Sequence, residues 1–361
     1  MKSLLKRIFH FDPFVFGSVI LIFCIGILSI YSSTGSQAAS RQLLFFFTGV
    51  FLCLIISFFD WRSFRENSFL VLVIYFFAIA LLVGVLFFGP EIRNVRRWFR
   101  LGTIMIAPAE FAKLTLIILL AKYFSDRHIE LYKVRHIILS GIYAFIPTYL
   151  VFRQPDLGTA IIFLVLWGGI LLISGIRLRH FIALCIATSL SLGLVWGFVM
   201  QDYQRDRVIS FIDPQVDPQG IGWGGNHARI AIGNGGFWGQ GLKEGSQTQY
   251  GFLPEPHTDF IFAAIAEEMG FVAVLLLVGS IALIVWRMLL VIFKSNSNFP
   301  RLFVSGFLIM FIFQSFVNMG MNLGILPIMG TPLPFASYGG GSMLLFFAGL
   351  GIFESIRYNS N

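Results

Sequence analysis

The sequence carries little charge for its length. Asp, Glu, Lys and Arg make up 12% of the 361 residues, about half of the roughly 25% that is usual in soluble domains. Hydrophobic residues account for 57%, and Phe alone occupies 42 positions. A soluble fold cannot bury that much apolar surface, and disordered chains have the opposite composition. These numbers exclude an ordinary cytosolic enzyme and predict a polytopic helical membrane protein.

Cysteine is also scarce. Cys24, Cys53 and Cys185 are the three in the chain, each lies in an apolar run, and no two form a Cys-x-x-Cys pair. This pattern supports neither a disulfide framework nor a zinc site. We interpret all three as small apolar packing residues.

Ten apolar runs approach the length that a helix needs to cross a bilayer, about 20 residues. Helices are expected because unpaired backbone groups are costly in lipid. The first run has about 18 apolar residues, more than the core of a signal peptide, so we expect an uncleaved span. The runs cover residues 13–32, 42–59, 69–88, 108–124, 137–152, 158–175, 180–199, 260–293, 302–326 and 336–356. We therefore predict an all-α fold of about ten transmembrane helices.

The distribution of Lys and Arg predicts the orientation. Cytoplasmic loops of membrane proteins are enriched in these residues, and most of them, beginning with Lys2, Lys6 and Arg7, fall inside if the N-terminus is cytoplasmic. Both termini are then cytoplasmic, so the net charge of +8 does not indicate nucleic-acid binding. Residues 200–259 become a large external loop between spans seven and eight. We expect this Gly-rich, aromatic loop to be ordered against the membrane face, within a single transmembrane domain of residues 1–361.

An external segment, 89–107, breaks this charge rule. Four arginines surround Trp98 and Phe99 on the side that should be poor in cations, and this enrichment points to a function. The arginines are Arg93, Arg96, Arg97 and Arg100.

Ionisable residues within or beside spans are candidate functional groups. Glu110 and Lys113 stand three residues apart, on one face of the fourth span. They form either a structural ion pair or the lining of a polar substrate cavity. Asp156 opens the sixth span after Pro155. It either caps that helix or faces an external cavity, where it helps to hold a metal or a metal-bound pyrophosphate.

The densest group of candidate residues closes the long loop, between Phe252 and Phe262. Thr258 or Asp259 can cap the following helix. Alternatively, Asp259 is a base at the external membrane boundary, with Glu255 and His257 beside it. Glu267 and Glu268, two to three turns deeper, are expected to be buried hydrogen-bonded structure.

The last external turn, from Leu326 to Ser342, is rich in proline and glycine. Irregular backbone at membrane depth is tolerated where it lines a cavity or is buried in protein. The turn containing Ser337, Tyr338 and Gly339 is either an anion-facing turn with free N–H donors or a structural re-entrant loop.

Four of these segments together resemble the SEDS family of membrane proteins, which contains RodA, FtsW and SpoVE. They occur in the family's order over nearly the whole chain, and Gln247–Gln249 and Asn318–Met321 look more like RodA than FtsW. The four segments are Gln154-Pro155-Asp156-Leu157-Gly158-Thr159, Ile230-Ala231-Ile232-Gly233 through Gly236, Leu253 to Phe262, and Pro332-Leu333-Pro334-Phe335 through Ser342.

The resemblance implies a peptidoglycan glycosyltransferase of the bacterial cytoplasmic membrane. Such an enzyme polymerises lipid II on the outer face, with a class B penicillin-binding protein as transpeptidase partner and with proteins of the elongation or division machinery. The family's essential aspartate falls on Asp259. Its other matching residues are Arg96, Trp98, Arg100, Glu110, Lys113 and Asp156.

The implied reaction is attack by a sugar hydroxyl on an anomeric carbon with inversion, and Asp259 takes the proton. Arg96 and Arg100 are the candidates for stabilising the leaving pyrophosphate, because guanidinium groups match phosphate oxygens. The cofactor stays undetermined. A divalent cation such as Mg²⁺ or Mn²⁺ held partly by pyrophosphate is an open alternative, and the sequence shows no tight protein cage for one.

The chain departs from the family pattern at three places. His227-Ala228 replace Gln-Ser, Asn234 replaces a serine in Gly-Ser-Gly-Gly, and Gly341 replaces the first serine of the final pair. These changes affect the expected substrate contacts and leave Asp259 in place. From the residues alone, a lipid II flippase and a non-catalytic scaffold remain alternatives to the enzyme.

Overall fold

The computed structural model describes residues 11–91, 95–102, 104–127, 134–194, 197, 205, 209, 211 and 222–359. Several residues used above therefore lie outside the described part of the chain. These are Lys2, Lys6, Arg7, Arg93 and most of the first third of the long loop.

Ten long helices in the described residues coincide with the ten predicted spans. They are α2 (Pro13–Thr34), α3 (Ser36–Phe58), α5 (Ser68–Phe88), α6 (Pro108–Asp126), α7 (Val134–Phe152), α8 (Leu157–Ile173), α9 (Leu178–Leu194), α13 (Ile261–Lys294), α14 (Asn298–Asn322) and α15 (Gly340–Asn359). By length and composition, α2, α3, α5, α7, α13 and α14 could each cross a membrane. The prediction of a polytopic helical fold is confirmed.

The remaining elements are short. They are α4 (Arg62–Glu66), α11 (Trp223–Gly235), α12 (Ser246–Gln249), and the strands β1 (Phe99–Leu101) and β2 (Ile104–Ile106). The strands form an antiparallel hairpin with Phe99 opposite Ile106. This hairpin lies in the arginine-rich segment and is a small exception to the all-α prediction.

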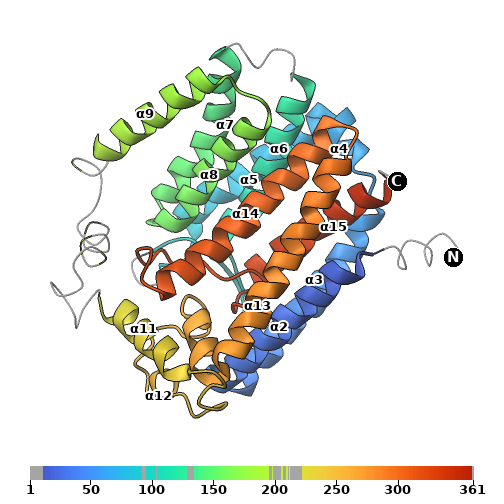
Figure 1. Cartoon of the computed structure of the whole chain (residues 1–361). Coiled ribbons are helices and arrows are strands. Elements are labelled where there is room, and N and C mark those ends of the chain that lie inside the picture. Colours follow the sequence, from blue (N-terminus) through green and yellow to red (C-terminus); the bar gives the residue numbers. More distant parts are fainter. Residues whose placement is uncertain are drawn as a thin grey trace, which may run out of the picture.

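The helices form a bundle in which α13 and α14 lie beside each other, while α11 and α12 lie together at one end (Figure 1). Helix α15 packs on α3, and α13 packs on α2. A row of buried phenylalanines runs along α14 at four-residue spacing, so their rings lie on one face of the helix. The row consists of Phe299, Phe303, Phe307 and Phe311. It forms the centre of the core between α6, α8 and α15.

The long loop is ordered over its described part, residues 222–259, as expected. Helix α11 packs on α13, and a Cβ added at Gly235 would collide with the main-chain oxygen of Ala266. Helix α13 is interrupted at Gly270, which has φ 73° and lies against the backbone of Gly239. A side chain would be excluded there by both conformation and contact. The break lets the loop dock onto the side of a transmembrane helix.

Glu267 and Glu268 have the structural role that we predicted. The fully buried Glu267 carboxylate accepts hydrogen bonds from the main-chain N–H groups of Gln247 and Thr248, at 2.7 and 2.9 Å. Glu268 accepts from the Ser32 hydroxyl at 2.7 Å. The two carboxylates therefore join α12 and α2 to α13.

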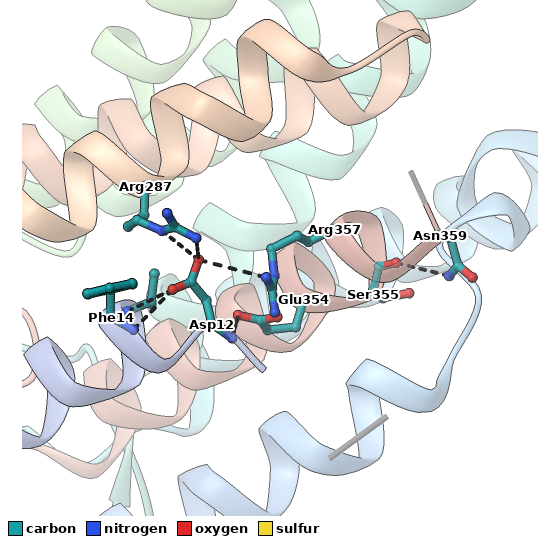
Figure 2. A network of polar contacts seen from close by, with 8 residues as sticks. Asp12, Phe14, Arg287, Glu354, Ser355, Arg357 and Asn359 are labelled. Atoms are coloured by element: carbon teal, nitrogen blue, oxygen red, sulfur yellow. Dashed lines mark hydrogen bonds and ion pairs between the residues drawn. The ribbon is translucent and has the colours of Figure 1, made fainter. Parts of the chain in front are cut away.

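A buried ionic network lies at the end of α13 remote from Asp259 (Figure 2). Asp12 caps α2 through the N–H of Phe14 and forms an ion pair of 2.6 Å with Arg287 of α13. Arg357 of α15 lies 3.9 Å from the same carboxylate and 3.0 Å from Glu354. Asp12 is 1% exposed. Removing one partner from such a buried network costs about 3–5 kcal/mol, so it fixes α2, α13 and α15 relative to one another.

Candidate functional site

Two of the predicted segments are joined by hydrogen bonds. These are the loop before α13, residues 252–260, and the turn before α15, residues 326–339. The N–H of Tyr338 donates to the carbonyl of His257 at 2.9 Å. The Ser337 hydroxyl donates to the carbonyl of Thr258 at 2.7 Å and accepts from the N–H of Leu333 at 2.8 Å. The irregular backbone of the turn is thus bonded within the protein, as membrane depth requires.

Gln42 of α3 forms hydrogen bonds to the turn at this junction. Its amide donates to the carbonyl of Ser337 at 3.0 Å and accepts from the N–H of Gly339 at 3.2 Å, and the side chain is fully buried. Our sequence interpretation missed Gln42. A glutamine at the first position of the apolar run 42–59 is the signal that could have identified it, since a buried amide must find partners.

The Asp259 main chain is held by two asparagines of α14. The side-chain amides of Asn318 and Asn322 each donate to the Asp259 carbonyl at 3.0 Å. The alternative in which Thr258 or Asp259 caps the helix is wrong. The cap position of α13 is Phe260, and no side chain forms a capping hydrogen bond there. The Asp259 carboxylate faces the turn instead, because Oδ2 would lie 3.6 Å from a Cβ added at Gly330.

His257 and Glu255 lie beside Asp259 in the same loop. His257 Nε2 is 3.7 Å from Glu255 Oε2, and the imidazole packs edge-on against Tyr338 with ring centres 5.6 Å apart. Burial lowers the pKa of His257, and the nearby Glu255 carboxylate opposes this change only in part. The ring is therefore mainly neutral at neutral pH.

The Glu110 and Lys113 side chains form the pair that their spacing predicts. Lys113 Nζ lies 2.8 Å from Glu110 Oε1, with the Lys113 side chain 1% exposed. The second carboxylate oxygen of Glu110 is buried and has no hydrogen-bond partner within the described chain. Gly341 lies above it, since a Cβ there would be 3.5 Å from Glu110 Cγ.

Asp156 both caps α8 and pairs with an arginine. Its carboxylate accepts from the N–H and the hydroxyl of Thr159, each at 3.1 Å, and lies 3.4 Å from Arg97. The guanidinium of Arg97 stacks over the Trp98 ring, 4.1 Å from its centre. The capping alternative for Asp156 is therefore confirmed, and its role toward an external cavity stays a prediction.

Arg97 is a residue that our selection missed. We selected Arg96 and Arg100 with Trp98, but both arginines make local, exposed contacts. Arg96 pairs with Glu91 at 2.9 Å, and Arg100 donates to the carbonyl of Gly102 at 3.2 Å. Arg97 pairs with Asp156, whereas Arg96 and Arg100 do not. This difference depends on the fold of the segment before β1, which the sequence does not show.

The Asp156 segment also reaches the turn before α15. A Cβ added at Gly158 would collide with the carbonyl oxygen of Met329 and would lie 3.0 Å from the Thr331 side chain. Glycine at this position allows the start of α8 to contact the turn directly. The turn therefore lies between Asp156 on one side and Asp259 on the other, and three distant segments converge.

Several buried polar atoms on these segments have no protein partner. An unpaired buried polar group costs about 1–3 kcal/mol, so these atoms are candidate contacts for a polar ligand. Within the described chain these atoms include Arg97 Nε, Glu110 Oε2, Gln154 Oε1, His257 Nδ1, Asn318 Oδ1 and Thr331 Oγ1. The same part of the chain contains no group of three or more His, Cys, Asp or Glu residues placed to hold a metal ion.

The sequence model of the FtsW/RodA/SpoVE family, described as "Cell cycle protein", matches residues 6–361. The chain belongs to this family. It is 38% identical over 284 residues to the peptidoglycan glycosyltransferase MrdB of Escherichia coli K12, covering 79% of this chain and 76% of MrdB. It is 33% identical to the stage V sporulation protein E of Bacillus subtilis, covering 94% and 95% of the two chains.

Solved structures of family members have the same fold. One comes from work described as "Structural coordination of polymerization and crosslinking by a peptidoglycan synthase complex". It has a TM-score of 0.84 and 31% identity, over 97% of this chain and 98% of the other. The structure of the rod-shape-determining protein RodA of Thermus thermophilus has a TM-score of 0.72 and 28% sequence identity, over 97% of each chain. The predicted family and the predicted class, a peptidoglycan glycosyltransferase, are confirmed. The chain is a multi-pass membrane protein.

Proposed function

We propose that this FtsW/RodA/SpoVE family member polymerises lipid II at the outer face of the bacterial cytoplasmic membrane, with Asp259 as the catalytic base. The observation that carries the proposal is the position of the Asp259 carboxylate. Two asparagines fix its main chain, its side chain caps no helix, and it faces the turn at Gly330. A carboxylate positioned at this junction can act as a base when a substrate hydroxyl lies within hydrogen-bond reach.

The reaction follows from the chemistry of the two sugars. The 4-hydroxyl oxygen of the acceptor forms a bond to the anomeric carbon of the donor, and the bond to pyrophosphate breaks with its electron pair on the phosphate. Asp259 takes the hydroxyl proton, and the anomeric centre inverts. An aspartate with a pKa near 3.9 is a weak base toward an alcohol, so proton transfer accompanies departure of the leaving group rather than preceding it. Glu255, His257 and Thr258 position the acceptor around this oxygen.

The donor pyrophosphate needs cationic groups as negative charge develops on it. Arg97, stacked on Trp98 and with a buried Nε free of protein partners, is the best placed of the arginines. Arg96 and Arg100 remain candidates from the same segment at the rim. Asp156 and the Glu110–Lys113 pair orient the donor from α8 and α6. A divalent cation would be held mainly by the pyrophosphate, with Asp156 as a protein ligand.

The turn before α15 contributes its backbone. Ser337, Tyr338 and Gly339 lie directly against the Asp259 loop, and their hydrogen bonds to His257, Thr258 and Gln42 fix them there. Their proposed role is to hold the substrate near Asp259.

The assignment includes an orientation and a partner. Both termini are cytoplasmic, residues 1–361 act as one transmembrane domain, and the loop of residues 200–259 is external. The partner is a class B penicillin-binding protein that cross-links the new strands, with elongation or division proteins around it. Similarity to a structure from a peptidoglycan synthase complex supports a partner of this kind.

The test uses purified protein and lipid II in detergent, with and without a partner transpeptidase. Polymer formation in detergent supports the enzyme, because no membrane sides exist for transport. A protein that moves lipid II across vesicle membranes but forms no polymer with any partner would instead be a flippase, and the proposal would fail.

A further inference from the structure

Three neighbouring aromatic rings form a cluster on the external loop, which we call the aromatic shelf: Trp223 and His227 of α11, and Phe252. The His227 and Phe252 rings are parallel within 8°, with centres 5.3 Å apart, and the Trp223 ring lies 4.0 Å from His227. Trp223 Nε1 donates to the carbonyl of Phe252 at 2.8 Å, and His227 Nδ1 lies 2.6 Å from Gln247 Oε1. Hydrogen bonds thus fix the rings before any ligand arrives.

The shelf is not the packing face of α11. The buried residues of this helix are Gly224, Ala228, Ala231 and Gly235; Gly224 and Ala228 directly follow Trp223 and His227. Ala228 and Ala231 form a small core with Leu253 and Phe260. Trp223 and His227 are only half-buried, and Phe252 is 37% exposed. Large aromatic rings ordered by polar contacts and left partly open are typical of a binding surface.

The shelf is continuous with the proposed catalytic site. A Cβ added at Gly224 would lie 2.9 Å from both Pro254 and Phe260, the residue after Asp259. A Cβ added at Gly225 would lie 3.9 Å from Ile328 of the turn before α15. The start of α11 therefore lies against both segments that flank the Asp259 carboxylate.

We propose that the aromatic shelf is a saccharide-binding subsite that stacks a pyranose ring of the growing glycan. This inference rests on the proposed function. The C–H face of a pyranose carries weak positive charge and complements the negative face of an aromatic ring. Gln247 and the His227 imidazole, which lie 2.6 Å apart, supply polar groups at the edge of the shelf for hydroxyl and acetamido substituents, which a purely apolar lipid tail would not use.

Trp223→Leu removes one aromatic ring from the shelf. Trp223→Phe keeps a ring but loses the hydrogen bond to the Phe252 carbonyl. Phe252→Leu is the second shelf variant, to be used if Trp223→Leu fails to fold. Trp238→Leu is the matched control, because Trp238 is an aromatic residue of the same loop, 77% exposed and outside the shelf. We expect Trp223→Leu and Phe252→Leu to shorten the glycan about three- to tenfold, the range of one aromatic contact. Lipid II consumption changes less, and Trp223→Phe and Trp238→Leu retain long strands.

Unchanged strand length in both shelf variants overturns the proposal. Equal shortening in Trp238→Leu also overturns it, because the aromatic residues would then serve to anchor the loop at the membrane. Binding of tetra-N-acetylchitotetraose to the wild type and to Trp223→Leu gives a readout that needs no polymerisation. Weaker binding by the variant supports the subsite even if the wild type forms no polymer, whereas equal binding contradicts it.

Discussion

The side-chain amide of Asn318 donates a hydrogen bond to the main-chain carbonyl of Asp259 at 3.0 Å. The same nitrogen donates to the carbonyl of Thr331 at 2.9 Å, and Asn318 is fully buried. One amide of α14 therefore holds together the loop that carries the proposed base and the turn that faces it. Small displacements of a catalytic group have large effects on rate, so this amide should matter to turnover as well as to stability.

Asn318→Leu is expected to lower lipid II polymerisation by tenfold or more, because it removes the amide that donates to the carbonyls of Asp259 and Thr331. The matched control is Gln314→Leu, one turn earlier on α14. Gln314 is also fully buried, but its side chain makes no hydrogen bond within the described chain. Initial rates for folded protein of each variant test this. Equal rates for the two variants would show that the Asn318 bonds do not position Asp259.

Arg97 and Arg96 should differ strongly although they are neighbours. Arg97→Ala is expected to raise the lipid II concentration needed for half-maximal rate about tenfold, because a guanidinium–phosphate contact is a strong, charge-assisted interaction. Arg96→Ala should change it less than twofold, since its exposed pair with Glu91 contributes about 0–1 kcal/mol. Rates measured over a range of lipid II concentrations give this value for each variant. A larger effect of Arg96→Ala than of Arg97→Ala would indicate that Arg96, and not Arg97, contacts the pyrophosphate.

The pKa of His257, lowered by burial, predicts a pH dependence. The unfolded chain has a His pKa near 6.5 and binds this proton more readily than the folded protein does. Stability therefore rises with pH through this region, is complete above pH about 6.5, and falls as the pH drops below it. Thermal unfolding in detergent between pH 5 and 8 should show this slope, and His257→Asn should reduce it. A slope that survives the substitution belongs to another group.

The ionic network at the other end of α13 should govern stability. Arg287→Met leaves the buried Asp12 carboxylate without its principal partner, and a loss of about 3–5 kcal/mol is expected. Arg301→Met is the control, because Arg301 is exposed and its guanidinium donates to the Asn298 side chain three residues away. Thermal midpoints in one detergent provide the comparison. The double variant Asp12→Leu/Arg287→Met should recover part of the loss, and the absence of any recovery would indicate that charge pairing is not the cause.

Apolar runs and charge distribution were sufficient to predict the ten helices, because membrane-spanning segments must satisfy their own backbone. The start of α15 was not predictable to the residue. Our predicted span began at 336, but Ser337 to Gly339 bond to the Asp259 loop and to Gln42, so the helix begins at Gly340. Hydropathy cannot detect such tertiary hydrogen bonds.

Some residues of the candidate site could be predicted from the sequence, and others could not, because their roles depend on tertiary contacts. Motif residues such as Asp156 and Asp259 were identified from their types and order. Spacing alone left a helix cap as one of two alternatives for Asp259, and the extra residue between it and α13 makes Phe260 the cap position. Gln42 and Asn318 lie in apolar runs far from the loops that they hold, and only their contacts in the fold reveal their role.

The most direct test of the central claim is the rate of lipid II polymerisation by purified Asp259→Asn. Asparagine keeps the size of the side chain and the main-chain carbonyl that Asn318 and Asn322 bind, while it cannot accept the proton. The expected result is a folded protein that binds lipid II and polymerises it about 10²–10⁴-fold more slowly, the usual contribution of a general base. Wild-type turnover by this variant would contradict the assignment of Asp259.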